Sequence, residues 1–170
     1  MRECYKLNHV DYVNDLNEYK QENLTVKGGK LVLGEMYKEG YVESCEIKIP
    51  ASSIVVGAWA AVTGLDNTVE LLVKVCVEGQ WSKYFSYGNW GLYRENYYYN
   101  DEDDVASINV DEIIIKNNKL ANKVQYKIIL RKEGSVSPKL SLVALNFKTE
   151  YAVLNKVDTR FLPMDVEYDV

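Results

Sequence analysis

The sequence predicts an all-β domain: an antiparallel β-sandwich of the jelly-roll or galactose-binding-like kind, with about eight strands. A long alternating run, a Glu-Gly turn and an aromatic alternating run follow one another over residues 69–90, which is typical of a β-hairpin. Short strand-like runs separated by Gly, Asn, Asp and Ser recur along the rest of the chain, with few helical patterns and no internal repeat. This combination favours a sandwich over an α/β fold, and a barrel is the alternative.

The hairpin places its apolar residues on one face, because side chains on a strand alternate. In its first arm these residues are Val69, Leu71, Val73, Val75 and Val77. In its second arm we expect one face to carry Trp81, Phe85 and Tyr87 and the other to carry Ser82, Tyr84 and Ser86. Glu78-Gly79 lies between the arms, where a turn needs glycine.

The chain divides into three parts by its patterns. Residues 1–28 are polar and mixed, and their apolar residues recur about every third position, which predicts a strap or a short helix; these are Leu7, Val10, Val13, Leu16 and Tyr19. The sandwich is expected over residues 29–150. Residues 151–170 lose periodicity and carry Leu162-Pro163, so we expect a C-terminal extension or linker.

Besides the hairpin, strands are expected at 30–34, 40–49, 53–62, 111–116, 123–132 and 138–147. In the run at 123–132 apolar and polar residues alternate, which predicts one solvated face. The last run is apolar on both faces, so we expect it to be a central strand.

Composition excludes several classes of function. The chain has 20 Lys and Arg against 25 Asp and Glu, a net charge of −5, so no overall positive field recruits nucleic acid, and we expect no nucleic-acid partner. No run approaches the roughly 20 apolar residues of a membrane span. Residues 1–19 are too polar to contain a signal-peptide core. We therefore expect a soluble chain and leave its compartment open.

Nucleophilic catalysis is not expected. The chain has one histidine, His9, and pairing it with Cys4 would place a dyad in a polar terminal segment with no third group to orient it. Catalysis by lysine or by paired carboxylates stays open, because such groups converge in space rather than in sequence. Cys45 and Cys76 lie within apparent strands and are expected to be small buried apolar residues.

The acidic segment at residues 100–104 is the candidate metal site, since Ca²⁺ takes carboxylate and carbonyl oxygens. Its expected ligands are Asp101, Asp103 and Asp104. An EF-hand loop that starts at Asn100 fails, because Val105 stands where that loop needs glycine. The alternative to a calcium site is a solvated charged loop.

Tyrosine is unusually frequent, with 14 residues, and crowds the segment just beyond Trp90. Such a loop offers flat amphipathic rings that stack on sugars or peptide side chains. The expected ligand-binding residues are Trp90, Tyr93, Tyr97, Tyr98 and Tyr99. The alternative is that the tyrosines fill sheet faces and that Trp59, Trp81, Phe85 and Trp90 belong to the core.

The order of several motifs is familiar. They are Gly29-Lys30-Leu31-Val32-Leu33, Gly40-Tyr41-Val42-Glu43-Ser44 with Ile47, a strand containing Trp59, Val73-Lys74-Val75-Cys76-Val77-Glu78-Gly79-Gln80-Trp81-Ser82-Lys83-Tyr84-Phe85, Gly88-Asn89-Trp90 and Asn109-Val110-Asp111-Glu112-Ile113. Over roughly residues 28–147 the chain resembles the β-sandwich region that precedes a C39-like, papain-like cysteine peptidase domain in secreted bacterial proteins. The resemblance implies an accessory module at the cell surface or outside the cell.

Two departures from that family bear on function. The family's usual Ser-Trp-Asn-Ala is here Ala58-Trp59-Ala60-Ala61, which removes polar groups. By this resemblance the peptidase would begin near Leu162-Pro163, close to the end of the given residues, and we expect no counterpart of its catalytic cysteine and histidine among them.

The sequence thus predicts a non-catalytic module that binds carbohydrate or cell-wall polymer and is associated with a C39-like peptidase. The alternative is a structural or protein-interaction domain that packs against the peptidase or another subunit.

Overall fold

The computed structural model describes residues 7–92 and 100–149, which form one short helix and fourteen strands. Every strand pairing is antiparallel, which confirms the all-β prediction. In chain order the elements are β1 (Asn8–Tyr12), α1 (Val13–Glu18), β2 (Lys20–Glu22), β3 (Leu24–Lys27), β4 (Lys30–Leu33), β5 (Glu39–Glu43), β6 (Ile47–Val62), β7 (Asn67–Val77), β8 (Gln80–Trp81), β9 (Phe85–Trp90), β10 (Asp101–Glu102), β11 (Ala106–Asn109), β12 (Glu112–Ile115), β13 (Ala121–Lys132) and β14 (Lys139–Thr149).

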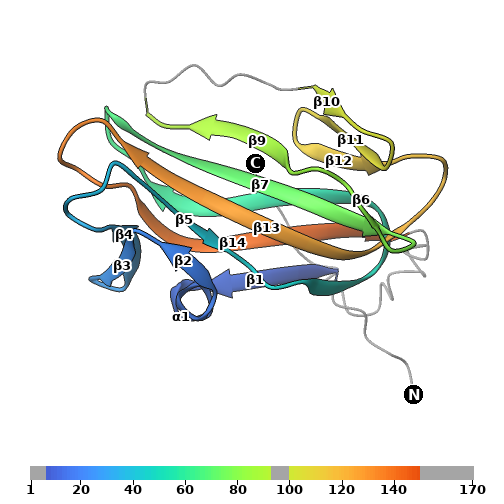
Figure 1. The fold of residues 1–170 in the computed structure, drawn as a ribbon, viewed down its shortest axis with the longest axis horizontal. Coiled ribbons are helices and arrows are strands. Elements are labelled where there is room, and N and C mark those ends of the chain that lie inside the picture. The colour runs from blue at the N-terminus through green and yellow to red at the C-terminus, as the bar shows by residue number, and fades with distance from the viewer. Residues whose placement is uncertain (1–6, 93–99, 150–170) are drawn as a thin grey trace, which may run out of the picture.

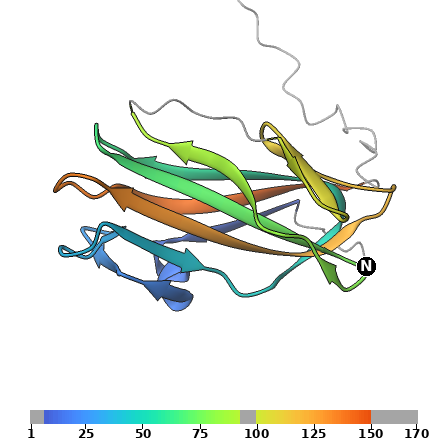
Figure 2. The same ribbon diagram turned by 45° about the horizontal axis from the view of Figure 1, so that its top comes forward.

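The long strands lie in two layers. One layer runs β9, β7, β13, β5 and β2, and the other runs β12, β6, β14 and β1. In Figure 1, β7 and β13 pass in front of β6 and β14. Turning the molecule shows β10 to β12 at one end of the long axis and β3 and β4 at the other (Figure 2). The predicted jelly-roll connectivity stays a prediction.

Strand β6 joins the two layers. It is 16 residues long, and its first part pairs with β13, whereas its second part pairs with β14 and β12. Pro50 lies in the first part, before the partners change. Proline has no N–H to donate to a ladder, so it is tolerated only where a pairing is interrupted. The chain of β6 is therefore continuous from one layer to the other, whereas its pairing with β13 is irregular around Pro50.

The core lies between the layers and is made of alternate residues of each long strand. Val124, Tyr126, Ile128 and Leu130 of β13 are fully buried, as the alternation predicted. Gly57 marks a close approach of the layers, because a Cβ there would come within 2.7 Å of Leu71 and 2.9 Å of the Tyr87 ring. The expected central strand is also confirmed, since β14 lies between β6 and β1.

The hairpin is confirmed in its first arm and corrected in its second. Glu78 and Gly79 both have positive φ, 51° and 87°, as a two-residue type I′ turn requires. The second arm is interrupted between β8 and β9, and Trp81 pairs with Cys76 whereas Phe85 pairs with Val73. Because Cys76 and Val73 are three residues apart, they face opposite ways. The expectation that Trp81 shares the face of Phe85 and Tyr87 is wrong.

Ser82 explains the interruption. Its backbone N–H donates to the carbonyl of Val75 at 2.9 Å, and its hydroxyl oxygen accepts from the Val75 N–H at 3.0 Å. Ser82 thus bonds to both the N–H and the carbonyl of Val75. Pairing between the arms resumes only at Phe85, which lies opposite Val73. The sequence showed only an unbroken aromatic alternation here.

Two further expectations need correction. The expected strand at 40–49 is two strands, because β5 ends at Glu43 and β6 begins at Ile47. The described part of the N-terminal segment contains a short helix, α1, which buries Val13 and Leu16, and it also forms β1, β2 and β3. Cys45 is exposed because it lies in the connection between β5 and β6, whereas Cys76 is buried as expected.

Candidate functional site

The predicted aromatic site is described only at Trp90, because Tyr93, Tyr97, Tyr98 and Tyr99 lie outside the described residues. Trp90 ends β9, and its ring meets that of Trp59 edge to face, with centroids 6.2 Å apart. Its indole N–H donates to the carbonyl of Tyr87 at 2.6 Å, which fixes the ring. The partner Trp59 comes from β6, so two strands distant in sequence supply the aromatic pair.

These two tryptophans line an open hollow of about 210 Å³, which we call the tryptophan hollow. Ala61, Thr63, Gly91 and Leu92 complete its lining. Both rings are half-buried, so each belongs partly to the core and partly to the surface. The sequence indicated Trp90 as a ligand-binding residue but Trp59 only as a core residue. That the two rings share a hollow depends on the arrangement of β6 and β9, which the sequence does not show.

The acidic segment has internal partners in the structure. Asp103 accepts backbone N–H groups of Lys83, Val105 and Ala106 at 2.7, 2.8 and 3.0 Å. Partial burial would raise the pKa of Asp103, but these bonds outweigh it and hold that pKa below its ordinary value. Asp101 forms an ion pair with the Lys83 ammonium. Within the described residues no three His, Cys, Asp or Glu side chains gather in a metal-binding group, and the calcium site at Asp101, Asp103 and Asp104 stays a prediction.

A second surface, which the sequence did not suggest, covers the outer side of β6, β14 and β1. On β6 the residues Val55 and Gly57 point into the core, so the alternate residues point outward. The strand register places the outward residues of all three strands side by side. The polar Asn8 and Asn146 are among them, near one end of the ladders. The apolar ones, which we call the apolar face, are Val10, Tyr12, Ile54, Val56, Ala58, Ala60, Val62, Leu142 and Ala144.

The apolar face is open to solvent over much of its area. Tyr12 and Val62 are 60% and 64% exposed, and Ala58 and Ala60 are also exposed. Across the ladders Ala60 lies opposite Leu142, and Ala144 lies opposite both Ala58 and Val10. The small alanines leave a flat centre between larger residues. Charged side chains lie at the two ends of the ladders, Glu112 and Lys148 at one end and Lys139, which pairs with Val62, at the other.

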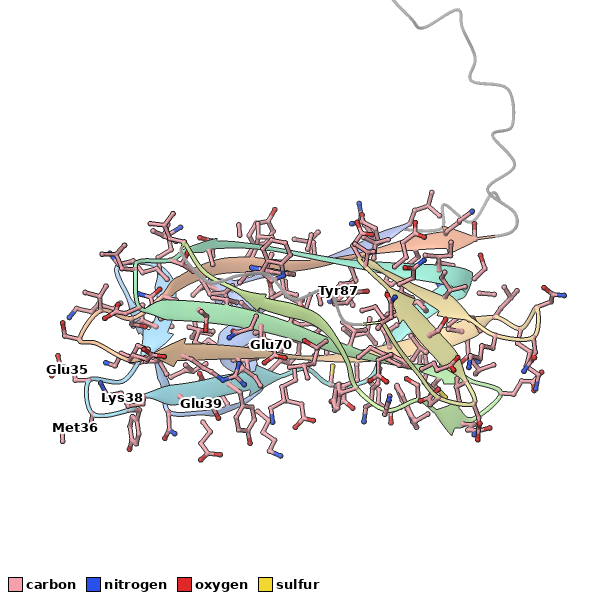
Figure 3. The ribbon with its side chains drawn as sticks, turned by 90° about the horizontal axis from the view of Figure 1, so that it is seen from above. Glu35, Met36, Lys38, Glu39, Glu70 and Tyr87 are labelled. Atoms are coloured by element: carbon pink, nitrogen blue, oxygen red, sulfur yellow. The ribbon has the colours of Figure 1, made fainter. Side chains whose placement is uncertain are left out.

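The outer side of the other layer differs in kind. Arg131 on β13 binds Glu39 and Glu70 at 2.6 Å each, and Figure 3 shows both glutamates on this layer. Lys127 lies 3.7 Å from the centroid of the Tyr41 ring. The charges of this face are therefore satisfied within it, as expected of a surface that meets water. Of the outer sides that residues 7–92 and 100–149 form on the two layers, the apolar face is the one that presents a broad area that water solvates poorly.

A polar cluster is buried between the layers, at Asp11 on β1. The Asp11 carboxylate is 4% exposed, and its Oδ2 accepts from Tyr126 Oη at 2.6 Å and from Tyr19 Oη at 3.2 Å. His9 Nε2 lies within hydrogen-bond distance of the same oxygen, at 2.8 Å. Burial, together with this carboxylate, raises the pKa values of Tyr126 and Tyr19. With three partners on one buried oxygen, Asp11 anchors β1 to the core.

Three further findings bear on function. In the described residues no helix is long and apolar enough to cross a membrane. A search of curated proteins gives no match to the chain. A family model, described as Peptidase C39 N-terminal domain, matches residues 12–147.

Proposed function

The chain belongs to the Peptidase C39 N-terminal domain family, and we propose on this premise that it is a non-catalytic accessory domain whose apolar face docks against a C39-like peptidase domain. The observation that carries the proposal is the apolar face itself. Exposed, contiguous apolar surfaces on soluble proteins mark interaction sites, because leaving them in water is unfavourable. The family's name supplies the partner, since an N-terminal domain of a peptidase is connected to that peptidase.

The position of β14 supports the same partner. Leu142 and Ala144 of β14 lie in the middle of the apolar face, between β6 and β1. The family match ends at residue 147, within this strand. A peptidase domain tethered to this strand would have a raised effective concentration at the face, which strengthens docking without added contacts.

The proposal is tested with separately purified domains, this one and a C39-like peptidase domain, mixed and measured by calorimetry. We expect binding that Ala58→Arg weakens at least tenfold, because it places an unpaired charge at the centre of the contact. Ala58 is exposed, so the free domain should keep its melting temperature.

The matched control is Gln80→Arg, which adds the same charge on the exposed edge strand β8 and should bind like the unchanged domain. Equal binding by both variants, or no binding by the unchanged domain, refutes the docking proposal.

A second candidate, binding of carbohydrate or cell-wall polymer, is supported by the tryptophan hollow. Its two rings offer stacking surfaces, and the tyrosine-rich segment begins directly after Leu92. Retention of the domain on insoluble polysaccharides and peptidoglycan tests it. We expect Trp90→Ala and the triple change of Tyr97, Tyr98 and Tyr99 to Ala to abolish retention. Retention that neither variant changes rejects this site.

A further inference from the structure

A groove of about 740 Å³ lies where β4 meets the connection between β13 and β14. Four lysines line it, Lys27, Lys30, Lys132 and Lys139, and we call it the lysine groove. Figure 3 labels Glu35 at this end of the molecule, and Glu35 is the one acidic residue of the lining. None of the four lysines belongs to the apolar face or the tryptophan hollow.

The groove has a positive charge in a chain whose net charge is −5. Elsewhere the basic residues are mostly paired with carboxylates, at Lys20, Lys83, Lys116, Lys119, Lys123 and Arg131. In the part of the chain that the structure describes, no ion pair involves a lysine of the groove. This concentration of unneutralised charge is therefore local and not a property of the whole surface.

Lys132 is the least expected of the four, since it is only 7% exposed. Its ammonium group has one hydrogen bond, to the backbone carbonyl of Glu35 at 3.2 Å. An ammonium carries three donors, and burying one without a counter-charge is unfavourable. An anion in the groove would supply that counter-charge.

Lys27 and Lys30 add a second unfavourable arrangement. They face each other across the hairpin of β3 and β4, where Gly28 and Gly29 form the turn with φ of 57° and 69°. Like charges directly opposite on neighbouring strands repel. Lys30 is held in place by a bond from its ammonium to the Ser141 hydroxyl at 2.8 Å. The hairpin thus places two ammonium groups that repel each other at the lysine groove, and a bound anion would reduce this repulsion.

From this geometry we propose that the lysine groove is a binding site for a ligand that carries phosphate groups. A phosphate group has up to two negative charges and three acceptor oxygens, which suits several ammonium groups acting as point charges. The volume exceeds what one phosphate needs, so a ligand with several phosphates in a row fits it best. The site is independent of docking to a peptidase.

The test uses sodium tripolyphosphate as the probe, with calorimetry at fixed ionic strength. Lys27→Gln with Lys139→Gln removes two exposed groove charges, and we expect the affinity to fall at least tenfold. Lys48→Gln with Lys148→Gln is the matched control, since both residues are exposed lysines outside the groove, and it should change the affinity less than threefold. An equal loss in the two double variants refutes the site, as does absence of binding at low salt.

Two further arms separate the possible ligands and roles. Citrate tests a carboxylate ligand of similar charge, and binding as tight as that of tripolyphosphate overturns the phosphate assignment. Lys132→Met removes the buried charge while keeping a long apolar side chain. We expect it to retain or raise the melting temperature without ligand and to lose most of the rise that tripolyphosphate gives. An undiminished rise in this variant contradicts the role of Lys132.

Discussion

Replacing Tyr126 with phenylalanine tests the buried cluster at Asp11. The change removes one hydroxyl, whose bond to the Asp11 carboxylate is 2.6 Å long, and leaves the ring in place. A hydrogen bond to a charged group contributes about 1.5–3 kcal/mol, against about 0.5–1.5 kcal/mol for one between neutral groups. We therefore expect Tyr126→Phe to lower the free energy of unfolding by about 2 kcal/mol at pH 7, or roughly 4 °C of melting temperature for each kcal/mol.

The loss should depend on pH, with a sign set by Asp11. Burial by itself would raise the pKa of Asp11, but its bonds to His9, Tyr126 and Tyr19 outweigh burial and hold that pKa below the ordinary value. A carboxylate with a lowered pKa stabilises the fold above the pKa of the unfolded chain, and this contribution disappears as the pH falls through the folded pKa. The cost of Tyr126→Phe should therefore shrink below about pH 4.

Tyr87→Phe is the matched control. Tyr87 is also buried, but its hydroxyl donates to a neutral acceptor, the backbone carbonyl of Val55, at 2.9 Å. Urea unfolding of both variants between pH 3 and pH 7 gives the comparison. We expect a cost of about 1 kcal/mol for Tyr87→Phe at every pH. Equal costs for the two variants at pH 7, or a cost for Tyr126→Phe that does not change with pH, would refute the reasoning.

Three other predictions concern the packing at Gly57, the interruption at Ser82 and calcium binding by the acidic segment. Gly57→Ala should destabilise the fold by about 1–3 kcal/mol in urea, because its Cβ would lie 2.7 Å from a core leucine, and an unchanged midpoint contradicts this close approach. Ser82→Ala should cost about 1–3 kcal/mol, since it leaves the buried Val75 N–H without its partner, whereas a neutral result means that water replaces the hydroxyl. Calcium at millimolar concentration should raise the melting temperature if the acidic segment binds it, and a melting temperature equal to that in chelator removes the metal site.

The sequence was most informative where one face of a strand is apolar and the other polar. The alternation from Val69 to Val77 and from Val124 to Leu130 placed β7 and β13 correctly, because period-two burial leaves a period-two pattern. The sequence predicted separate strands at 40–49 and 53–62, on either side of Pro50, whereas β6 runs from Ile47 to Val62. Proline usually marks an edge, and the sequence does not show that the strand changes partners here. Trp81 was assigned to the wrong face because the interruption at Ser82 shifts the register between β8 and β9 without changing the alternation in the sequence.

The candidate surfaces were harder to predict for a different reason. On β6, apolar residues occupy both faces from Ile54 to Val62, so periodicity indicates a strand and cannot say which face meets solvent. The lysines of the lysine groove come from the hairpin of β3 and β4 and from the connection between β13 and β14, which are more than 90 residues apart. The pairing of β4 with β14 brings them together. Neither surface leaves a local motif, so the tertiary contacts were needed to find it.

The pairing of the first and last described strands has a mechanical consequence. Asn8 at the start of β1 lies opposite Asn146 near the end of β14, and the Phe147 N–H donates to the Leu7 carbonyl at 2.9 Å. The chain thus enters and leaves the domain at adjacent points. Tension between flanking segments would peel β1 from β14 one bond at a time instead of shearing the whole ladder. The domain would therefore yield first at this seam, and Asp11, further along β1, is where the peeling would meet its first strong resistance.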